Sequence, residues 1–212
     1  MGTDSILSWV EVLGAVLGSL TALITAIIAL KPIIRYFKKR TAARREETFN
    51  NVNMRISDML SELRMKSKAS RTSLTQFHNG GKFADGSCMR RMSISHQSCD
   101  PKTPSTMQFR QDVLVSRFVE IIQQLRDNDS HIRMTSGLFE SNTKKFYELH
   151  DTIAFSILPL FCNDSLVVYG YITIEWCDLG TLDNVDETAT KTEFEYTRDQ
   201  ISFLLNSAKD YR

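Results

Sequence analysis

The stretch FHNGGKFADG, residues 77–86, combines a histidine with glycines that free the backbone. One interpretation is chemical: His78 faces a ligand while the backbone at Gly80 and Gly81 lies close to it. The other is structural, because Asn-Gly supplies the positive φ angles that a tight hairpin turn requires. A turn explains Asn79 and Gly80 but leaves His78 and Gly81 unexplained. Both interpretations stay open at this point.

Polar residues of the following segment could complete such a ligand site. In CMRRMSISH, residues 88–96, a serine and a histidine follow two arginines. Hydroxyl, imidazole and guanidinium groups can donate hydrogen bonds to an anionic ligand. The alternative for Arg90 and Arg91 is a solvated strand face. The predicted ligand-binding residues are His78, Asn79, Gly80, Gly81, Ser93 and His96.

The sequence lacks the motifs of common catalytic and metal sites. It has no glycine-rich phosphate loop, no paired-carboxylate motif and no GxSxG. The four cysteines form no CxxC and have no histidine at ligand spacing, so neither zinc nor a disulfide is predicted. With 26 basic and 25 acidic residues, no bulk charge indicates nucleic-acid binding. We expect no enzymatic activity, no metal and no cofactor.

Strand and helix signals alternate from residue 67 to the end of the chain. Alternating apolar residues predict strands, and amphipathic periodicity predicts helices. Strands are expected over 70–78, 88–96, 131–139, 152–162 and 166–177, and helices over 110–126, 142–151 and beyond 190. The last two strands form an antiparallel hairpin. Near its end, Trp176 is expected in the core, and Glu175 either exposed or paired with Lys or Arg on a neighbouring strand.

Two of the predicted helices have a defined apolar face. The face of helix 110–126 consists of Val115, Phe118, Val119, Ile122 and Leu125. The face of the last helix consists of Phe194, Ile201, Leu204, Leu205 and Ala208. Each face is expected to pack on the sheet or on a partner helix.

The N-terminal part of the chain contains an uncharged apolar run from Val12 to Leu30. A helix of that length rises about 28 Å, close to the hydrocarbon thickness of a bilayer. A buried core helix would show a polar face, and a cleaved signal peptide would carry its basic residues before the apolar run. The sequence therefore predicts one transmembrane helix over 12–34.

Charge sets the orientation of this helix. Asp4 and Glu11 precede it, whereas the charged residues from 31 to 45 are all Lys or Arg. Positive charge stays on the cytoplasmic side, so residues 1–11 are expected outside and the rest in the cytoplasm, with the protein in the inner (plasma) membrane. The basic cluster also predicts contact with anionic headgroups of the bilayer.

Small residues recur every four positions within the predicted span. Such a stripe lets two membrane helices approach closely. The alternative is that Gly and Ala are simply common in membrane helices. The residues of the stripe are Gly14, Gly18, Ala22 and Ala26.

A second stripe lies in the juxtamembrane segment, residues 35–66. Its spacing of three and four residues is that of a heptad seam and predicts a short coiled-coil helix and a homodimer. The alternative is a single amphipathic helix lying on the domain that follows. The residues of the seam are Phe49, Val52, Ile56, Met59 and Leu63.

The order helix, strand, strand, helix, strand, short helix, strand, strand, helix resembles that of GAF domains of the PAS/GAF sensor superfamily. The likeness covers about residues 60–210 and rests also on YGYITIEW, residues 169–176, where GAF domains carry Gly before alternating apolar residues. The FHNGG stretch is similar to that of membrane-anchored GAF-like proteins of phages and environmental bacteria. Some GAF-like proteins reduce methionine sulfoxide through cysteines, which makes Cys88 and Cys99 a candidate pair if a thiolate is stabilised there.

The resemblance implies an α+β fold for residues 67–212, with an antiparallel sheet of five or six strands. The first and last helices would lie on one face, commonly as the dimer interface, with a ligand cavity or an empty pocket on the other face. The function implied is a membrane-anchored sensory or ligand-binding protein that signals through dimerisation or a partner, with an unknown small-molecule ligand. The alternative is a phage-type membrane scaffold that oligomerises without a small-molecule ligand.

Overall fold

The computed structural model describes residues 30, 41, 45–82, 88–128, 130–161 and 167–209. Within these ranges, no helix is both long enough and apolar enough to cross a bilayer. The predicted transmembrane helix, including its small-residue stripe, lies outside the described residues except for Leu30 and stays a prediction. From residue 50 onward the chain forms one compact unit.

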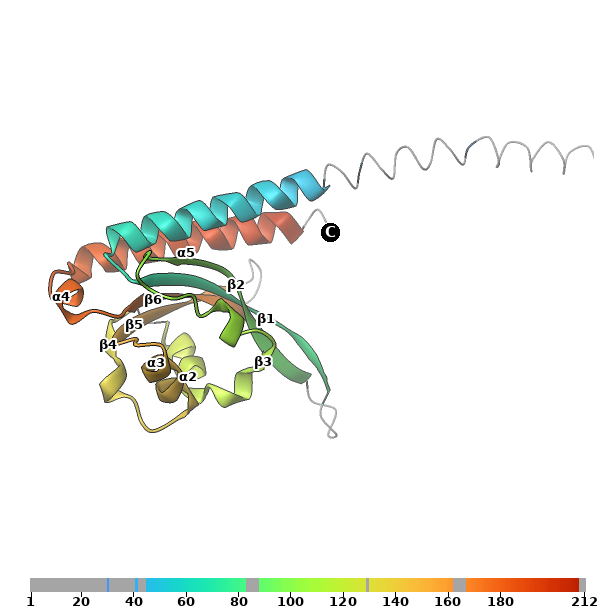
Figure 1. Cartoon of the computed structure of the whole chain (residues 1–212). Coiled ribbons are helices and arrows are strands. Elements are labelled where there is room, and N and C mark those ends of the chain that lie inside the picture. Colours follow the sequence, from blue (N-terminus) through green and yellow to red (C-terminus); the bar gives the residue numbers. More distant parts are fainter. Residues whose placement is uncertain are drawn as a thin grey trace, which may run out of the picture. The chain divides into compact units, whose positions relative to one another are not determined.

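An antiparallel sheet forms the middle layer of this unit (Figure 1). The spatial order of its strands is β3-β2-β1-β6-β5-β4, so an N-terminal and a C-terminal hairpin meet at the centre through β1 and β6. Six strands among the described residues confirm the predicted α+β class and sheet. The strands are β1 (Arg71–Lys82), β2 (Cys88–Cys99), β3 (Val113–Leu114), β4 (Arg133–Met134), β5 (Ala154–Phe161) and β6 (Val168–Trp176).

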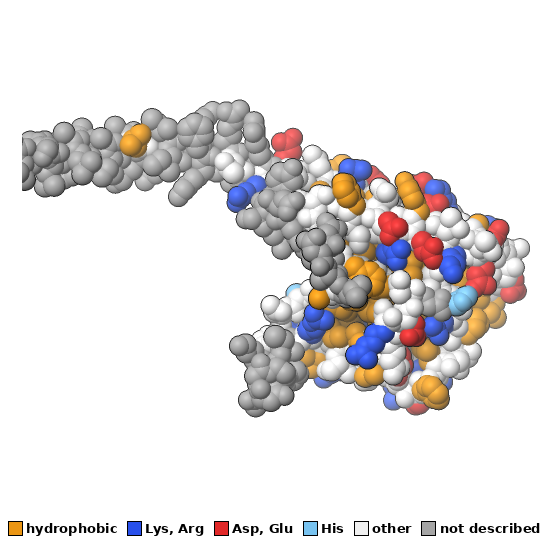
Figure 2. Space-filling model, turned by 180° about the vertical axis from the view of Figure 1, so that it is seen from behind, with side chains coloured by type: hydrophobic (Ala, Val, Ile, Leu, Met, Phe, Trp, Pro, Cys, Tyr) orange, Lys and Arg blue, Asp and Glu red, His pale blue; other side chains and the backbone are white. Residues whose placement is uncertain are grey.

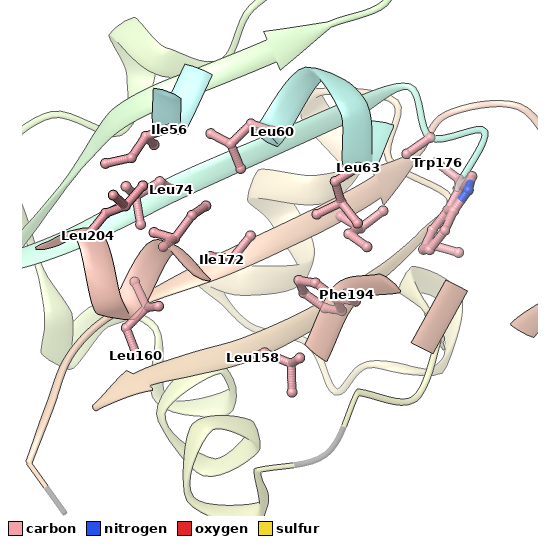
Figure 3. Packing of buried hydrophobic residues seen from close by; sticks show 14 residues of the cluster. Ile56, Leu60, Leu63, Leu74, Leu158, Leu160, Ile172, Trp176, Phe194 and Leu204 are labelled. Atoms are coloured by element: carbon pink, nitrogen blue, oxygen red, sulfur yellow. The ribbon is translucent and has the colours of Figure 1, made fainter. Parts of the chain in front are cut away.

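One face of the sheet is covered by the first described helix, residues 45–66, and by α5, Glu187–Lys209 (Figure 1). Ile56, Leu60 and Leu63 of the first helix belong to the same buried core as Leu74 of β1 and Ile172 of β6 (Figure 3). All five side chains are inaccessible to solvent. Burial of this apolar face holds the first helix on the sheet.

The last helix contributes its predicted face to the same core. Phe194, Ile201 and Leu204 are buried there. Trp176 is also buried, as predicted, and its indole Nε1 donates a hydrogen bond to the Ser67 carbonyl at 3.1 Å. This bond joins the end of β6 to the chain just after the first helix.

The first helix does not bury the whole predicted heptad seam. Ile56 and Leu63 of the seam are buried, but Phe49 is 54% exposed. Leu60, which is not on the seam, is inaccessible to solvent. The buried face therefore follows the 3.6-residue period of a helix lying on a sheet, which confirms the alternative of an amphipathic helix on the domain. Dimerisation through this helix stays a prediction.

The opposite face of the sheet carries α2, Val119–Asp127, and α3, Asn142–Leu149 (Figure 1). The Ser141 hydroxyl caps α3 by accepting a hydrogen bond from the Lys144 amide at 3.2 Å. Asn128 ends α2 in the left-handed conformation, with φ of 48°. The buried residues of this second core are Met92, Val115, Phe118, Ile121, Leu125, Tyr147, Phe155, Ile157 and Tyr171.

Shorter elements connect these layers. The 3₁₀ turns are η1 (Met107–Phe109), η2 (Val115–Arg117) and η3 (Thr135–Gly137), and η3 with β4 occupies most of the predicted strand 131–139. A short helix, α4 (Leu179–Leu182), precedes α5 and is capped by the Asp178 carboxylate, which accepts a hydrogen bond from the Thr181 amide at 2.7 Å. The segment between β6 and α5 therefore contains a helical turn.

The predicted helix 110–126 begins nine residues too early. Asp112 has a positive φ of 54°, and its carbonyl and carboxylate accept hydrogen bonds from Arg91 at 2.6 and 2.9 Å. The chain then forms β3 and η2 before α2 begins. The 3₁₀ turn shifts the helical register, so that Val119 is 54% exposed and Ile121 lies in the core instead.

Asn79 and Gly80 do not form the predicted tight turn. β1 continues to Lys82, which pairs with Cys88, and Asn79 pairs with Arg90. The register shifts between Asn79 and Lys82, where Gly81 has φ of 111°. A glycine with positive φ is typical of a β-bulge as well as of a turn. The connection between the two strands falls in residues 83–87, outside the described ranges.

Replacing Leu60 by alanine is expected to lower the free energy of unfolding by about 2–5 kcal/mol, because a buried side chain is lost and a cavity remains. The variant Phe49→Ala is expected to change it by less than about 0.5 kcal/mol, because that side chain is largely exposed. Urea unfolding followed by tryptophan fluorescence measures both. A coiled-coil seam would give the reverse order, and a larger loss for Phe49→Ala would contradict the packing described here.

Candidate functional site

A row of polar side chains lies on the α2–α3 face of the two central strands. Strand alternation places Arg71, Ser73 and Thr75 of β1 on this face. The pairing of β1 with β6 sets Glu175 opposite Arg71 and Thr173 opposite Ser73. All five side chains are at most 1% exposed. The centre of the sheet is therefore polar on the face where a core is normally apolar.

Arg71 and Glu175 form a buried ion pair. The Arg71 Nε atom donates to Glu175 Oε2 at 2.9 Å, and Thr152 Oγ1 donates to the same oxygen at 3.0 Å. Arg71 Nη2 donates to Thr152 Oγ1 at 2.6 Å and to the His150 carbonyl at 2.8 Å, and Nη1 donates to the Pro104 carbonyl at 3.2 Å. The prediction that Glu175 pairs with a basic residue on a neighbouring strand is confirmed.

Arg110 is a second buried cation. It follows η1 in the loop between β2 and β3, and its carbonyl accepts a hydrogen bond from the Ile94 amide at 3.0 Å. The guanidinium carbon lies 4.1 Å from the ring centroid of Phe146 and 5.0 Å from that of Phe118. The side chain is inaccessible to solvent, and none of its three nitrogens has a hydrogen-bond partner among the described residues.

The aromatic neighbours offset part of the cost of this burial. A desolvated cation on an aromatic face gains about 2 kcal/mol, whereas an unpaired buried charge costs several kcal/mol. Burial lowers the pKa of Arg110. Tyr171, Tyr147 and Glu175 together raise it by more than burial lowers it, so that the pKa lies above its ordinary value. Arg110 therefore carries its full positive charge inside the domain.

Other buried polar atoms between the sheet and the α2–α3 side also lack partners among the described residues. Each such atom costs about 1–3 kcal/mol unless a hydrogen bond is made, and native cores contain few of them. They come from β1 and β6 on one side, and from α3 and the residue that follows it on the other. Together with Arg110, they are called the polar layer below. The atoms are Ser73 Oγ, Thr75 Oγ1, Thr173 Oγ1, Tyr147 OH and His150 Nε2.

His150 lies where this polar layer approaches the surface. Its ring packs on Phe146 at 4.6 Å and on Phe109 at 4.9 Å between centroids. Burial, Arg71 and Arg110 lower the pKa of the imidazole, while Glu175 opposes them. His150 is therefore neutral at physiological pH and can act as a hydrogen-bond donor or acceptor.

Two pockets lie against the loop between β2 and β3. Pro104 lines both of them, and Arg110 lines neither. The first, of about 920 Å³, is lined in part by Arg64, Asp100 and His150. The second, of about 840 Å³, is lined in part by Ile94, Met107 and Gln111. The loop between β2 and β3 separates the two pockets and carries Arg110.

At its start, near Ser105 and Thr106, this loop is bonded to β2 through the Gln97 side chain. The Gln97 amide oxygen accepts hydrogen bonds from the Ser105 hydroxyl at 2.6 Å and from the Thr106 amide at 3.0 Å, and its nitrogen donates to the Thr106 hydroxyl at 2.8 Å. Few apolar contacts join the segment 100–105 to the cores.

The predicted ligand residues lie toward the other end of the β1–β2 hairpin. His78 Nε2 lies 2.9 Å from the Ser93 hydroxyl, so the structure brings these two side chains together. His78 and Asn79 are exposed. By alternation along β1, His78 shares the face of Leu74, which the long helices cover, and not the face of the polar row.

His96 lies apart from that pair. It is opposite Leu74 on β1, is half-buried, and its Nδ1 atom lies 3.0 Å from the Ser95 hydroxyl. Burial lowers the pKa of its imidazole. The six predicted residues therefore do not form one cluster, and their contact with a ligand stays a prediction.

Two cysteines whose side chains the structure describes, Cys99 and Cys177, are not activated. Cys99 and Cys177 are free thiols. Burial raises the pKa of both, and the opposing effect of Arg71 is smaller. A thiolate is thus disfavoured at Cys99, contrary to what the sulfoxide-reducing alternative requires. Within the ranges described above, no group of three His, Cys, Asp or Glu side chains is arranged to hold a metal ion.

Sequence reasoning identified neither Arg71 nor Arg110 as a site residue. A signal existed for Arg71, because residues 71, 73 and 75 place polar side chains on one face of a predicted strand. Arg110 gives no such signal, since it lies in a loop and its aromatic neighbours come from η2–α2 and α3. The environment of Arg110 depends on contacts between segments that are distant in sequence.

No protein-family model and no curated protein matches the chain. Solved structures match it in fold. A far-red cyanobacteriochrome photoreceptor is 9% identical with a TM-score of 0.56, and the match covers 83% of this chain and 97% of that chain. The phycoerythrobilin-bound GAF domain of a cyanobacterial phytochrome is 15% identical with a TM-score of 0.53, covering 81% and 93%.

A third match is the GAF domain of a two-component sensor histidine kinase from Bacillus halodurans, which is 12% identical with a TM-score of 0.52 and covers 78% and 96% of the two chains. At these identities the matches establish the fold. The chain has a GAF-like fold, as its element order predicts. The likeness to membrane-anchored phage proteins stays a prediction.

Changing Glu175 to glutamine is expected to lower the free energy of unfolding by about 3–5 kcal/mol, because Arg71 would be left buried without a counter-charge. The matched control Glu62→Gln removes a carboxylate that pairs with Lys66 on the surface, where Glu193 also binds the same ammonium group. Little change is expected there. Denaturant unfolding of both variants is the measurement. An equal loss of unfolding free energy in the two variants would show that the buried Arg71–Glu175 pair stabilises the domain no more than a surface pair does.

Proposed function

We propose that the chain is a membrane-anchored sensory protein whose GAF-like domain binds a small molecule between the sheet and the α2–α3 layer. The observation that carries this proposal is the group of buried polar atoms without partners around Arg110. A layer that served packing alone would favour apolar or fully hydrogen-bonded side chains. A ligand with complementary polar groups would supply the missing hydrogen bonds.

The structural neighbours support ligand binding within this fold. Two of the neighbours are GAF domains from a cyanobacterial phytochrome, one bound to phycoerythrobilin and one to phycocyanobilin, and a third neighbour belongs to a sensor histidine kinase. For the present chain, the proposal covers a small molecule held by polar groups. The nature of these groups is a property of its own residues and not of the fold.

The alternative of a scaffold without a ligand predicts a dry, filled core. The unpartnered polar atoms of the polar layer are not expected in such a core. Exposed apolar side chains are nevertheless present on the two long helices, where Met54, Met65 and Phe203 are 63–65% exposed. These side chains support signalling through a second copy or a partner, with ligand binding changing how the helices pack.

The surface charge supports the expectation that nucleic acid is not a partner. On the face drawn in Figure 2, Lys and Arg side chains are intermixed with Asp and Glu. Binding to a phosphate backbone needs a basic patch or stripe. The basic residues 31–45 are assigned instead to anionic headgroups, with the transmembrane helix over 12–34 and the folded domain in the cytoplasm.

Replacing both Gly14 and Gly18 by leucine is expected to reduce the dimer fraction of the full-length protein in vesicles severalfold, because larger side chains keep the two helices apart. Energy transfer between labelled chains measures dimerisation, and flotation measures membrane retention, which should not change. The control Val12→Leu with Val16→Leu enlarges side chains off the stripe. An unchanged dimer fraction would assign the span to anchoring alone.

The variant Thr173→Val tests ligand binding in the polar layer. Without a ligand, its free energy of unfolding should stay the same or rise, because an unpartnered buried hydroxyl is removed. Native mass spectrometry of the detergent-solubilised full-length protein should show a bound small molecule, held about fivefold more weakly by the variant.

The matched control is Thr72→Val in β1, which makes the same substitution on the opposite face of the sheet. The Thr72 hydroxyl donates to the Leu60 carbonyl at 2.7 Å, so its loss should cost about 1 kcal/mol of stability and leave the bound mass unchanged. A wild-type protein without any bound mass, or an equal loss of bound mass in both variants, would count against the proposed function.

A further inference from the structure

The buried interior of the described domain has an unequal number of positive and negative charges. Three charged side chains are buried: Arg71, Glu175 and Arg110. The Glu175 carboxylate is paired with Arg71 at 2.9 Å and also accepts a hydrogen bond from Thr152. One positive charge, that of Arg110, is left without a negative partner.

The immediate surroundings of Arg110 stabilise its flat face but not its edge. Phe146 lies on the guanidinium at 4.1 Å, with Phe118 at 5.0 Å and Tyr147 at 5.7 Å. Hydrogen bonding takes place at the N–H groups along the edge. Among the described residues no acceptor meets hydrogen-bond geometry with these groups, although the Tyr147 phenol is near enough to raise the pKa of Arg110. The edge of a guanidinium matches the two oxygens of a carboxylate in a bidentate pair.

Neutral hydrogen-bonding groups complete the layer. Ser73, Thr75 and Thr173 provide hydroxyls from the sheet, and Tyr147 and His150 provide a phenol and an imidazole nitrogen from the α3 segment, all without partners among the described residues. These groups suit the hydroxyl or carbonyl substituents of a polar molecule. None of them carries a charge that would repel an anion.

Resting on the proposed ligand-binding function, we propose that the molecule held in this layer is a small organic acid whose carboxylate pairs with Arg110. The charge count favours a single carboxylate over a phosphate group. A carboxylate brings the buried charge to zero, whereas a phosphate dianion would leave a buried negative charge without a partner. No lysine side chain is among the buried residues of the described domain to compensate it.

The test compares acids with their uncharged amides. Full-length protein in detergent, in Tris chloride at constant ionic strength, is melted with acetate, lactate or benzoate, and in parallel with acetamide, lactamide or benzamide. We expect at least one acid to raise Tm saturably, by about 5 °C at saturation, and its amide to have little effect. Inorganic phosphate is included as the dianion.

Variants of Arg110 assign the effect to this side chain. Arg110→Met removes the unpaired buried charge, so its Tm without additive should be equal or higher, and the shift with the acid should disappear. Arg110→Lys keeps the charge without the planar fork, so a smaller shift should remain and shows that the layer is still folded. Thr72→Val should keep the wild-type shift.

Three results would overturn the proposal: an acid that stabilises Arg110→Met as much as the wild type, amides or phosphate that act as well as the acids, or no saturable shift with any of the three acids. A bound mass in native mass spectrometry together with any of these results leaves the proposed ligand-binding function standing and rejects only the carboxylate. Absence of both a bound mass and a shift rejects the two proposals together.

Discussion

The antiparallel pairing of β1 with β6 is the constraint on which the rest of the domain depends. It joins residues that are 104 positions apart, Arg71 and Glu175, at the centre of the sheet. Gly170 permits the close approach, because a Cβ atom at this position would collide with the Thr75 backbone oxygen. A slip of one residue in this register would exchange the two faces of both strands. The apolar face under the long helices and the polar row on the other side therefore come from the same register.

The two buried arginines are in different electrostatic situations, and the difference points to function. Arg71 donates hydrogen bonds to Glu175, to Thr152 and to the carbonyls of Pro104 and His150. These bonds connect the sheet to the end of α3 and to the β2–β3 loop. Arg110 is buried to the same degree but has aromatic rings in place of an acceptor. Buried charges without partners are rare because of their cost. Where such a charge is retained, a partner outside the chain is a physical reason for it.

In the proposed function the layer between the sheet and α2–α3 holds the ligand, and the residues of this chain, rather than its GAF-like fold, decide which ligand that is. The loop between β2 and β3 carries Arg110 and lies between two pockets. Gln97 fastens it through hydrogen bonds that a moderate movement can break. A ligand bound under this loop would change its contacts with the sheet, whose opposite face carries the long helices with exposed Met54, Met65 and Phe203.

The sequence by itself determined the order of the main elements, the antiparallel sheet, the buried Trp176 and the apolar face of α5. These features depend on local periodicity, which a single segment carries. The sequence misjudged Asn79-Gly80 and the start of α2, and it missed Leu60 on the buried face of the first helix. A glycine suits a bulge as well as a turn, and the face that a helix buries depends on what lies beneath it. The polar layer around Arg110 was decided by tertiary structure alone. A charge becomes unpaired only when segments distant in sequence close around it and exclude water.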